Sequence, residues 1–252
     1  MNLAIEPHLR SLGSYWFLLL EIGRDLFGRG IDRKELARQI VTIGNNSLLI
    51  VFLTSLFTGM VLALQTAYGL ERFGAKNYVG NIVSLGLVRE LGPVLTAIML
   101  CGRVGAGIAA EIASMVATEQ VDAMRALGAS PIRKLVTPRV VAAVIVLPLL
   151  TVLADLFGIG GGILVAVFEL DLTAHQYYRS IMYTLLIRDV LDGLIKSAIF
   201  GFLFVTIACF RGLTTSGGTE GVGNSTTSAV VTGSVVILIS DFFITKVLIL
   251  LS

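Results

Sequence analysis

Charged side chains recur at helical spacing in a stretch of the chain that is otherwise apolar. Arg188, Asp192 and Lys196 follow one another at intervals of four, so a helix would place all three on one face. Asp189 lies seven residues before Lys196 and shares that side. Each ionisable group costs at least about 2.5–3.5 kcal/mol at the centre of a membrane-spanning helix, so such groups need partners or a hydrated cavity.

Two explanations fit these charges. Ion pairs along one helix would let a polar segment enter the bilayer without any functional role. Alternatively, the charges line a space that receives an amphiphile, with Asp241 of another apolar stretch and the Arg89–Glu90 pair of a third as partners. We favour the second explanation, because a purely structural pair needs two helices and three contribute charge here. The candidate substrate-binding or gating residues are Arg89, Glu90, Asp189, Lys196 and Asp241.

The elements that position these residues are predicted to be membrane-spanning helices. The chain has 252 residues, of which 55% are hydrophobic and only 14% charged, against about a quarter charged in soluble domains. Apolar runs of about 22 residues form helices of roughly 33 Å, enough to cross a bilayer. The sequence predicts an all-α membrane protein with five spans, at about 47–68, 79–117, 140–168, 187–210 and 229–251.

Local signals refine this architecture. Pro93, together with Arg89 and Glu90, predicts a kink or a projecting end in the long second span, and Pro148 and the glycines of 158–162 are possible bend points in the third. Small residues at intervals of four predict close helix packing in the second and fourth spans. They form three rows: Gly102, Ala106, Ala110 and Ser114; Gly105, Ala109, Ala113 and Ala117; and Gly193, Ser197 and Gly201. Residues 217–223 are rich in glycine and are interpreted as a flexible loop.

The segment 1–46 is predicted to be a helical segment that lies in the cytoplasm or at the membrane interface, outside the spans. Residues 12–27 form an amphipathic pattern whose apolar face includes Tyr15 and Trp16, which suits a helix in the plane of the membrane interface. A soluble cytoplasmic helix is the alternative. Lysine and arginine favour a cytoplasmic N-terminus and a periplasmic C-terminus, with eleven on the cytoplasmic side and three outside. The absence of a signal or transit peptide favours a bacterial plasma membrane.

Several kinds of chemistry are excluded by the residues present. The chain has no P-loop, no H-E-x-x-H zinc motif and no G-x-S-x-G nucleophile elbow, so we expect no catalytic residue, metal site or cofactor. Its net charge of +2 and the lack of a basic, aromatic-rich stretch argue against nucleic-acid binding. Any energy coupling must therefore come from an ion gradient or from another subunit. An odd number of spans also precludes two equal inverted halves in one chain, so a two-fold pathway would require a dimer.

The loop after the second span carries a short, firmly bounded helix. The residues 119–131 predict a helix that ends at a glycine, followed by Pro131 and the next span. Three apolar residues on this helix suit docking on a protein, and three polar ones suit polar contacts. The apolar set is Val121, Met124 and Leu127, and the polar set is Glu119, Asp122 and Arg125. A solvated connector is the alternative, but connectors seldom need an amphipathic helix with such clear start and stop signals.

This loop resembles the cytoplasmic coupling loop of ABC-transporter permeases, and the chain over about 10–252 resembles the MlaE (YrbE) family of bacterial lipid-transport permeases. The stretches that carry the resemblance are Leu87–Pro93, Glu111–Pro131, Leu135–Arg139 and Thr215–Val231, supported by Asp189, Lys196–Ser197 and Asp241–Phe242. The first two are highly specific. The resemblance assigns residues 47–252 to a permease transmembrane domain.

The resemblance implies a homodimeric permease in the inner membrane, with a cytoplasmic ABC ATPase, often a STAS-domain subunit, and a periplasmic ring of MCE-domain protein. It implies that a glycerophospholipid is the substrate and that outer-membrane lipid asymmetry depends on its movement. The helix at about 119–128 would meet the ATPase through Glu119, Asp122, Met124, Arg125, Leu127 and Gly128. Two rival functions stay open on the residues alone: an ion-coupled secondary transporter, and a non-transporting scaffold for a periplasmic ring.

Overall fold

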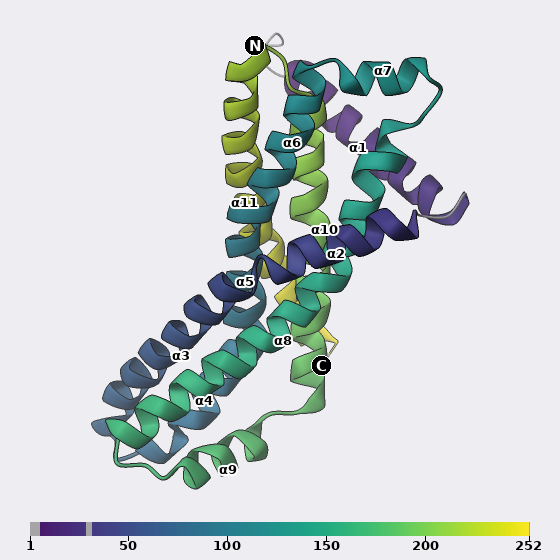
Figure 1. Cartoon of the computed structure of the whole chain (residues 1–252). Helices are drawn as coiled ribbons and strands as arrows, with labels where there is room; N and C mark the ends of the chain where they lie inside the picture. The colour runs from purple at the N-terminus through teal and green to yellow at the C-terminus, as the bar shows by residue number, and fades with distance from the viewer. Residues whose placement is uncertain (1–5, 29–31, 252) are drawn as a thin grey trace. The chain divides into compact units, whose positions relative to one another are not determined.

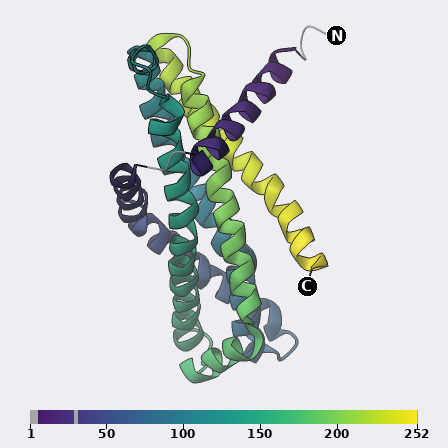
Figure 2. The same cartoon turned by 90° about the vertical axis from the view of Figure 1, so that its right-hand side faces the viewer.

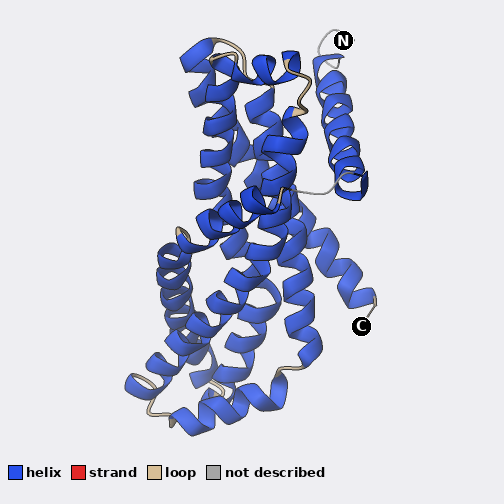
Figure 3. Ribbon diagram, turned by 45° about the vertical axis from the view of Figure 1, so that its right-hand side comes forward, coloured by secondary structure: helices blue, strands red, loops and turns tan. Residues whose placement is uncertain are grey.

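The computed structural model describes residues 6–28 and 32–251, with side chains from 13 to 26 and from 32 to 251, and every regular element in these ranges is a helix (Figures 1 and 3). The α-helices are α1 (Glu6–Gly28), α2 (Arg33–Asn45), α3 (Leu48–Glu71), α4 (Val79–Gly86), α5 (Gly92–Leu100), α6 (Ala106–Ala117), α7 (Gln120–Ala126), α8 (Thr137–Phe168), α9 (Ala174–Thr184), α10 (Ile187–Leu213) and α11 (Gly218–Leu250). Three π-helical turns, η2 (Leu87–Leu91), η3 (Cys101–Gly105) and η4 (Ile132–Val136), and one 3-10 turn, η1 (Lys76–Tyr78), join them. The all-α prediction is confirmed.

The described residues contain five helical segments that are long and apolar enough to cross a membrane. They are Arg33–Glu71, Lys76–Ala117, Ile132–Phe168, Ile187–Leu213 and Gly218–Leu250. The first four include the corresponding predicted spans, and the fifth covers all but the last residue of the predicted span 229–251. The helix predicted at 12–27 falls within α1 and α2 lies in the predicted helical segment 1–46, whereas α9 has no counterpart in the prediction. Whether α1 lies in the membrane interface stays a prediction.

The second span is interrupted twice by π-helical turns. The first, η2, contains Arg89 and Glu90, where a kink was predicted, and the second, η3, contains Arg103 and was not foreseen. A π turn inserts one extra residue into the i→i−4 ladder, and such turns are frequent at functional sites. The charged pair Arg89–Glu90 therefore lies on an irregular part of the helix.

The interpretation of residues 217–223 as a flexible loop is wrong. Helix α11 begins at Gly218, directly after Gly217, and both glycines have a positive φ that forms the tight turn after α10. Gly221 is needed for close approach, since a Cβ there would collide with the carbonyl oxygen of Ser216. Thr215 and Ser225 then join the turn to the helix through a hydroxyl–hydroxyl hydrogen bond of 2.8 Å. The glycines shape a turn and a helix start.

The chain divides into two compact units. The first comprises the described residues up to Ile43 with Cys101–Ala143 and Phe202–Val236, and the second comprises Gly44–Leu100, Val144–Gly201 and Ile237 to the end of the described chain. Within the first unit α1 packs against η4 and contacts α10. The Tyr15 hydroxyl shares a hydrogen bond of 2.7 Å with Thr206, and burial raises the pKa of the Tyr15 phenol, which stays neutral.

One predicted row of small residues packs within the first unit. Gly105, Ala109 and Ala113 are buried, and a Cβ on Gly212 of α10 would lie 3.0 Å from the Ala109 carbonyl oxygen. The parallel row that starts at Gly102 is exposed or half-buried. Of these two rows, the one that starts at Gly105 therefore provides close packing inside this chain.

The second unit is held together by close crossings of helix backbones. Gly59 of α3 meets the carbonyl oxygen of Gly158 in α8, and Gly161 meets that of Leu56, so a Cβ on either glycine would collide with backbone. Helix α8 is continuous through Pro148 and residues 158–162, where bends were predicted, and Gly158 and Gly161 allow α3 to approach it closely. Helix α9 packs on α4, where Tyr177 joins a buried apolar cluster (Figures 1 and 2).

Candidate functional site

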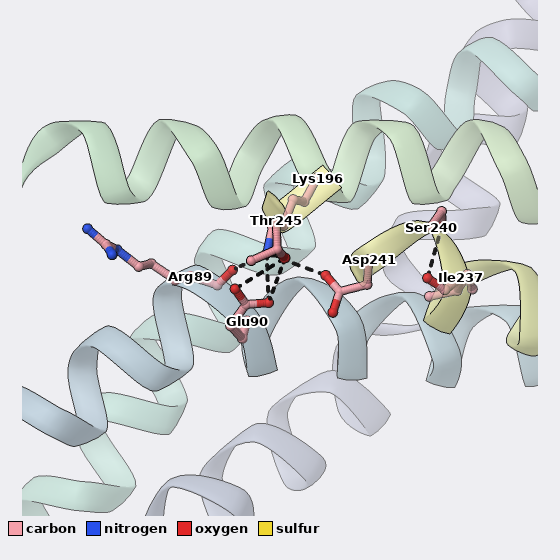
Figure 4. A network of polar contacts seen from close by, with 7 residues as sticks. All are labelled: Arg89, Glu90, Lys196, Ile237, Ser240, Asp241 and Thr245. Atoms are coloured by element: carbon pink, nitrogen blue, oxygen red, sulfur yellow. Dashed lines mark hydrogen bonds and ion pairs between the residues drawn. The ribbon is translucent and has the colours of Figure 1, made fainter. Parts of the chain in front are cut away.

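Three helical elements of the second unit bring charged side chains together. The π turn η2 supplies Arg89 and Glu90, α10 supplies Lys196, and the C-terminal part of α11 supplies Asp241 and Thr245 (Figure 4). The close approach of α10 and η2 depends on Gly193, because a Cβ there would collide with the carbonyl oxygen of Val88. The small-residue row predicted in the fourth span therefore places Lys196 one turn further along, beside η2.

Lys196 is the centre of this cluster and its side chain is only 2% exposed. Its ammonium group donates hydrogen bonds to the Glu90 carboxylate at 2.6 Å, the Thr245 hydroxyl at 2.6 Å and the Arg89 carbonyl oxygen at 3.0 Å. The Asp241 carboxylate completes an ion pair at 3.4 Å. One buried cation thus faces two carboxylates, and its three hydrogen bonds use every donor of the ammonium group.

Arg89 forms a second pair beside the first. Its guanidinium points away from Lys196 in Figure 4 and donates to the Asp189 carboxylate, with a distance of 2.7 Å from Nε to Oδ1. Asp189 is buried and also accepts a hydrogen bond from the backbone N–H of Leu186 at 2.9 Å, just before the first turn of α10. The Arg89 side chain is half-exposed. Asp189 therefore fixes both the start of α10 and the orientation of Arg89.

All five predicted site residues therefore join interhelical ion pairs within one unit. The alternative of an ion-pair ladder along α10 does not describe Lys196, which contacts η2 and α11 instead. Thr245 was missed by sequence reasoning. The available signal was its position four residues after Asp241, which places both on one face of α11.

The cluster borders two pockets of different character. A small pocket of about 60 Å³ is lined by Arg89, Glu90, Arg188, Asp192, Lys196, Thr245, Leu248 and Ile249. An open pocket of about 490 Å³ is lined by Glu90, Leu238, Asp241, Phe242, Thr245, Lys246, Ile249 and Leu250. Glu90, Thr245 and Ile249 line both. A polar recess next to a larger, mainly apolar space offers complementary surfaces to the two ends of an amphiphile.

The apolar space is continuous with an unpartnered helix face. In Figure 2 the last turns of α11 diverge from α10, and Phe242, Phe243 and Ile249 among others are more than half exposed. The Glu90 side chain, 40% exposed, lies at the edge of this face. The ion pairs are therefore accessible from one side and are not enclosed in a solid bundle.

The predicted coupling helix belongs to the first unit and ends as expected. Helix α7 stops at a Schellman motif, in which the Ala129 N–H donates to the Met124 carbonyl oxygen and the Gly128 N–H to that of Arg125. Gly128 has a φ of +73°, which explains the glycine. Glu119, just before the helix, also has a positive φ of 58°.

The surface of α7 differs from the prediction in one respect. Val121 is 2% exposed and packs against its own chain, so it is not available for docking. Leu127 is 85% exposed and Met124 is half-buried, which leaves a smaller apolar surface at the end of the helix. Asp122 and Arg125 form an exposed ion pair of 2.8 Å on the same helix.

Comparison with known proteins relates the chain to membrane permeases. A protein-family model described as "Permease MlaE" matches residues 36–247. A probable ABC transporter permease protein of Rickettsia felis is 48% identical over 94% of this chain and 92% of the relative. A probable ABC transporter permease protein of Synechocystis is 40% identical over 93% and 89%. The intermembrane phospholipid transport system permease protein MlaE of Haemophilus influenzae is 38% identical over 95% and 92%.

Proposed function

The chain belongs to the MlaE permease family, and on this premise we propose that it is the membrane subunit of an ABC transporter for glycerophospholipids. It would move lipid between the bacterial inner membrane and a periplasmic MCE-domain carrier, and so help to maintain outer-membrane lipid asymmetry. Residues 1–46 would form a peripheral segment and residues 47–252 the permease domain. The relatives named as ABC permeases favour this function over a secondary transporter or a scaffold.

The observation that carries the proposal is the charged cluster at the edge of the larger pocket. A two-tailed lipid needs an apolar surface for its chains and polar groups where its head group leaves water. The pocket of about 490 Å³ supplies apolar side chains from α11, and Glu90, Asp241 and Thr245 lie in its wall. Lys196 holds these groups together and would release or orient them as the pathway opens.

Further subunits complete the proposed transporter. A second copy of the chain would cover the exposed apolar face of α11 and close a two-fold pathway. A cytoplasmic ABC ATPase would bind α7 through the predicted coupling residues, and a STAS-domain subunit and a periplasmic MCE ring would bind elsewhere. Closure of the ATPases would then move the helices that flank α7 as a rigid body.

One purification tests the proposal against both rivals. The chain is expressed with its neighbouring subunits, purified, and examined by lipid mass spectrometry and an ATPase assay. We expect bound glycerophospholipid and a nucleotide-hydrolysing partner, and we expect ATP-dependent lipid transfer after reconstitution in liposomes. Transfer that follows a proton or sodium gradient without nucleotide would support the secondary transporter. A complex without lipid or transfer would support the scaffold.

The double substitution Met124→Ala/Leu127→Ala tests the coupling role of α7. Loss of the exposed apolar contact is expected to weaken ATPase association and lipid transfer by at least about tenfold, as removal of an interface anchor does. Co-purification of the ATPase and the transfer rate are the measurements. Leu186→Ala removes a similarly exposed leucine outside α7 and serves as the matched control. Unchanged association in the double variant would contradict the role.

The proposed orientation places Ala129 in the cytoplasm. A cysteine at this exposed position, in a chain whose buried Cys101 and Cys209 are replaced by alanine, is expected to resist a thiol reagent that cannot cross the membrane. The reagent should label the site only after the membrane is permeabilised. A cysteine at the exposed Phe73, in a loop assigned to the outside, should react in intact cells. The opposite labelling pattern would reverse the topology.

A further inference from the structure

An ion pair that sequence analysis did not identify joins the two helices on either side of the α7 loop. Glu111 lies in α6, six residues before that helix ends at Ala117, and Arg139 lies two residues after α8 begins at Thr137. Their side chains meet at 2.8 Å, from Arg139 Nη2 to Glu111 Oε1. The contact thus closes the base of the loop that carries α7.

The Arg139 guanidinium contacts both sides of this loop at once. Besides the Glu111 carboxylate, it donates from Nη1 to the Leu135 carbonyl oxygen at 3.0 Å, which lies in the π turn η4 at the end of the loop. The planar, forked guanidinium group can hold two acceptors in fixed directions, which an ammonium group does less well. Arg139 is therefore a rigid link between α6 and η4.

The two partners of this ion pair differ in the free-energy cost of their burial. The Arg139 side chain is 4% exposed, whereas the Glu111 side chain is 56% exposed. Burial of a guanidinium is costly, and an apolar side chain of similar size would pack at least as stably. A half-exposed glutamate, in turn, needs no partner for its own stability. Packing alone does not account for a buried arginine at this position.

Other helices of the first unit pack closely against α6 and η4, the two elements at the base of the α7 loop. Helix α1 packs on η4 with Leu18 and Ile22 buried. Helix α10 approaches α6 so closely that a Cβ on Gly212 would lie 2.8 Å from Ile112 Cβ, one residue after Glu111. Elements that pack this tightly move together when one of them is displaced.

We propose that Arg139 is a positioning residue that, through Glu111, makes α6, η4 and α8 follow α7 as one body when the ATPase moves it. The proposal rests on the proposed function, since it assumes that α7 receives the motion of the ATPase. Without the link, α7 would still dock and the ATPase would still hydrolyse nucleotide. Part of the displacement would then be lost at the loop base, and less lipid would move for each ATP consumed.

The test measures lipid transferred per ATP hydrolysed in the reconstituted full complex. Arg139→Met removes the buried charge and leaves a glutamate that tolerates exposure, so this variant should fold and assemble. We expect its transfer-to-hydrolysis ratio to fall by about tenfold, within the range of coupling between distant sites, while assembly and hydrolysis stay near the unsubstituted values. Arg139→Lys keeps the charge but not the fork, and its ratio should lie in between.

The charge-reversed variant Glu111→Arg/Arg139→Glu restores an ion pair across the loop base and should recover most of the lost ratio. Arg38→Met removes an exposed arginine that pairs with Glu35 within α2 and should leave the ratio unchanged. If assembly, hydrolysis and transfer fall together in Arg139→Met and Arg139→Lys, the pair is merely structural and the proposal is overturned. An unchanged ratio in both variants overturns it as well. A complex of unsubstituted chains that transfers no lipid refutes the proposed function instead.

Discussion

Replacing Lys196 by methionine is expected to reduce lipid transfer roughly a hundredfold and to lower the free energy of unfolding by about 3 kcal/mol. The physical reason is that Lys196 pairs with both Glu90 and Asp241, and its removal leaves two adjacent carboxylates without their shared partner. This loss of unfolding free energy is at the lower end for a broken buried ion pair, because Glu90 is partly exposed. Thermal unfolding in detergent and transfer in liposomes are the two measurements.

A second variant separates function from stability. Glu90→Gln/Lys196→Met removes one charge of each sign, so more than half of the lost stability should return while lipid transfer stays low. Lys76→Met makes the same chemical change at an exposed lysine, paired with Glu71 at 2.8 Å, and should alter neither measurement. Recovery of transfer together with stability would show that the ion pairs are static and do not take part in lipid movement.

Replacing Gly59 by alanine is expected to lower the free energy of unfolding by about 3 kcal/mol, at the upper end for overpacking of a core. The added Cβ would lie 2.8 Å from Gly158 Cα and still closer to the Gly158 carbonyl oxygen. These are backbone atoms and have no alternative rotamer, so α3 and α8 would have to move apart. We expect a lower unfolding temperature and less folded protein in detergent.

Gly69→Ala provides the matched control on the same helix. Nothing lies within 4 Å of a Cβ at Gly69, and alanine in a helix is favoured over glycine by about 0.5–1 kcal/mol. This variant should unfold at the same temperature as the unsubstituted chain or slightly above it. Equal unfolding temperatures for the Gly59 and Gly69 variants would show that α3 and α8 do not cross as closely as described.

Local patterns in the sequence were sufficient for the five spans and for the end of α7. The five spans follow from the length of the apolar runs, and the glycine end of α7 follows from one residue whose φ must be positive. The π turn at Arg89 and Glu90 coincides with the predicted kink. These features depend on neighbours a few residues apart, which the order of amino acids specifies directly. Glycine content failed as a signal near Gly218, because glycine serves a turn, a helix start and close packing alike.

Tertiary structure alone decided which charges meet. Lys196 has acceptable partners by spacing on its own helix, yet it pairs with Glu90 and Asp241 because Gly193 lets α10 approach η2. Arg139 directly precedes the predicted span 140–168, and its partner Glu111 comes within reach only in the folded chain. Helical period determines which side chains share a face. Which faces then meet depends on how closely the helices approach one another where they cross. That distance is set only in the folded chain.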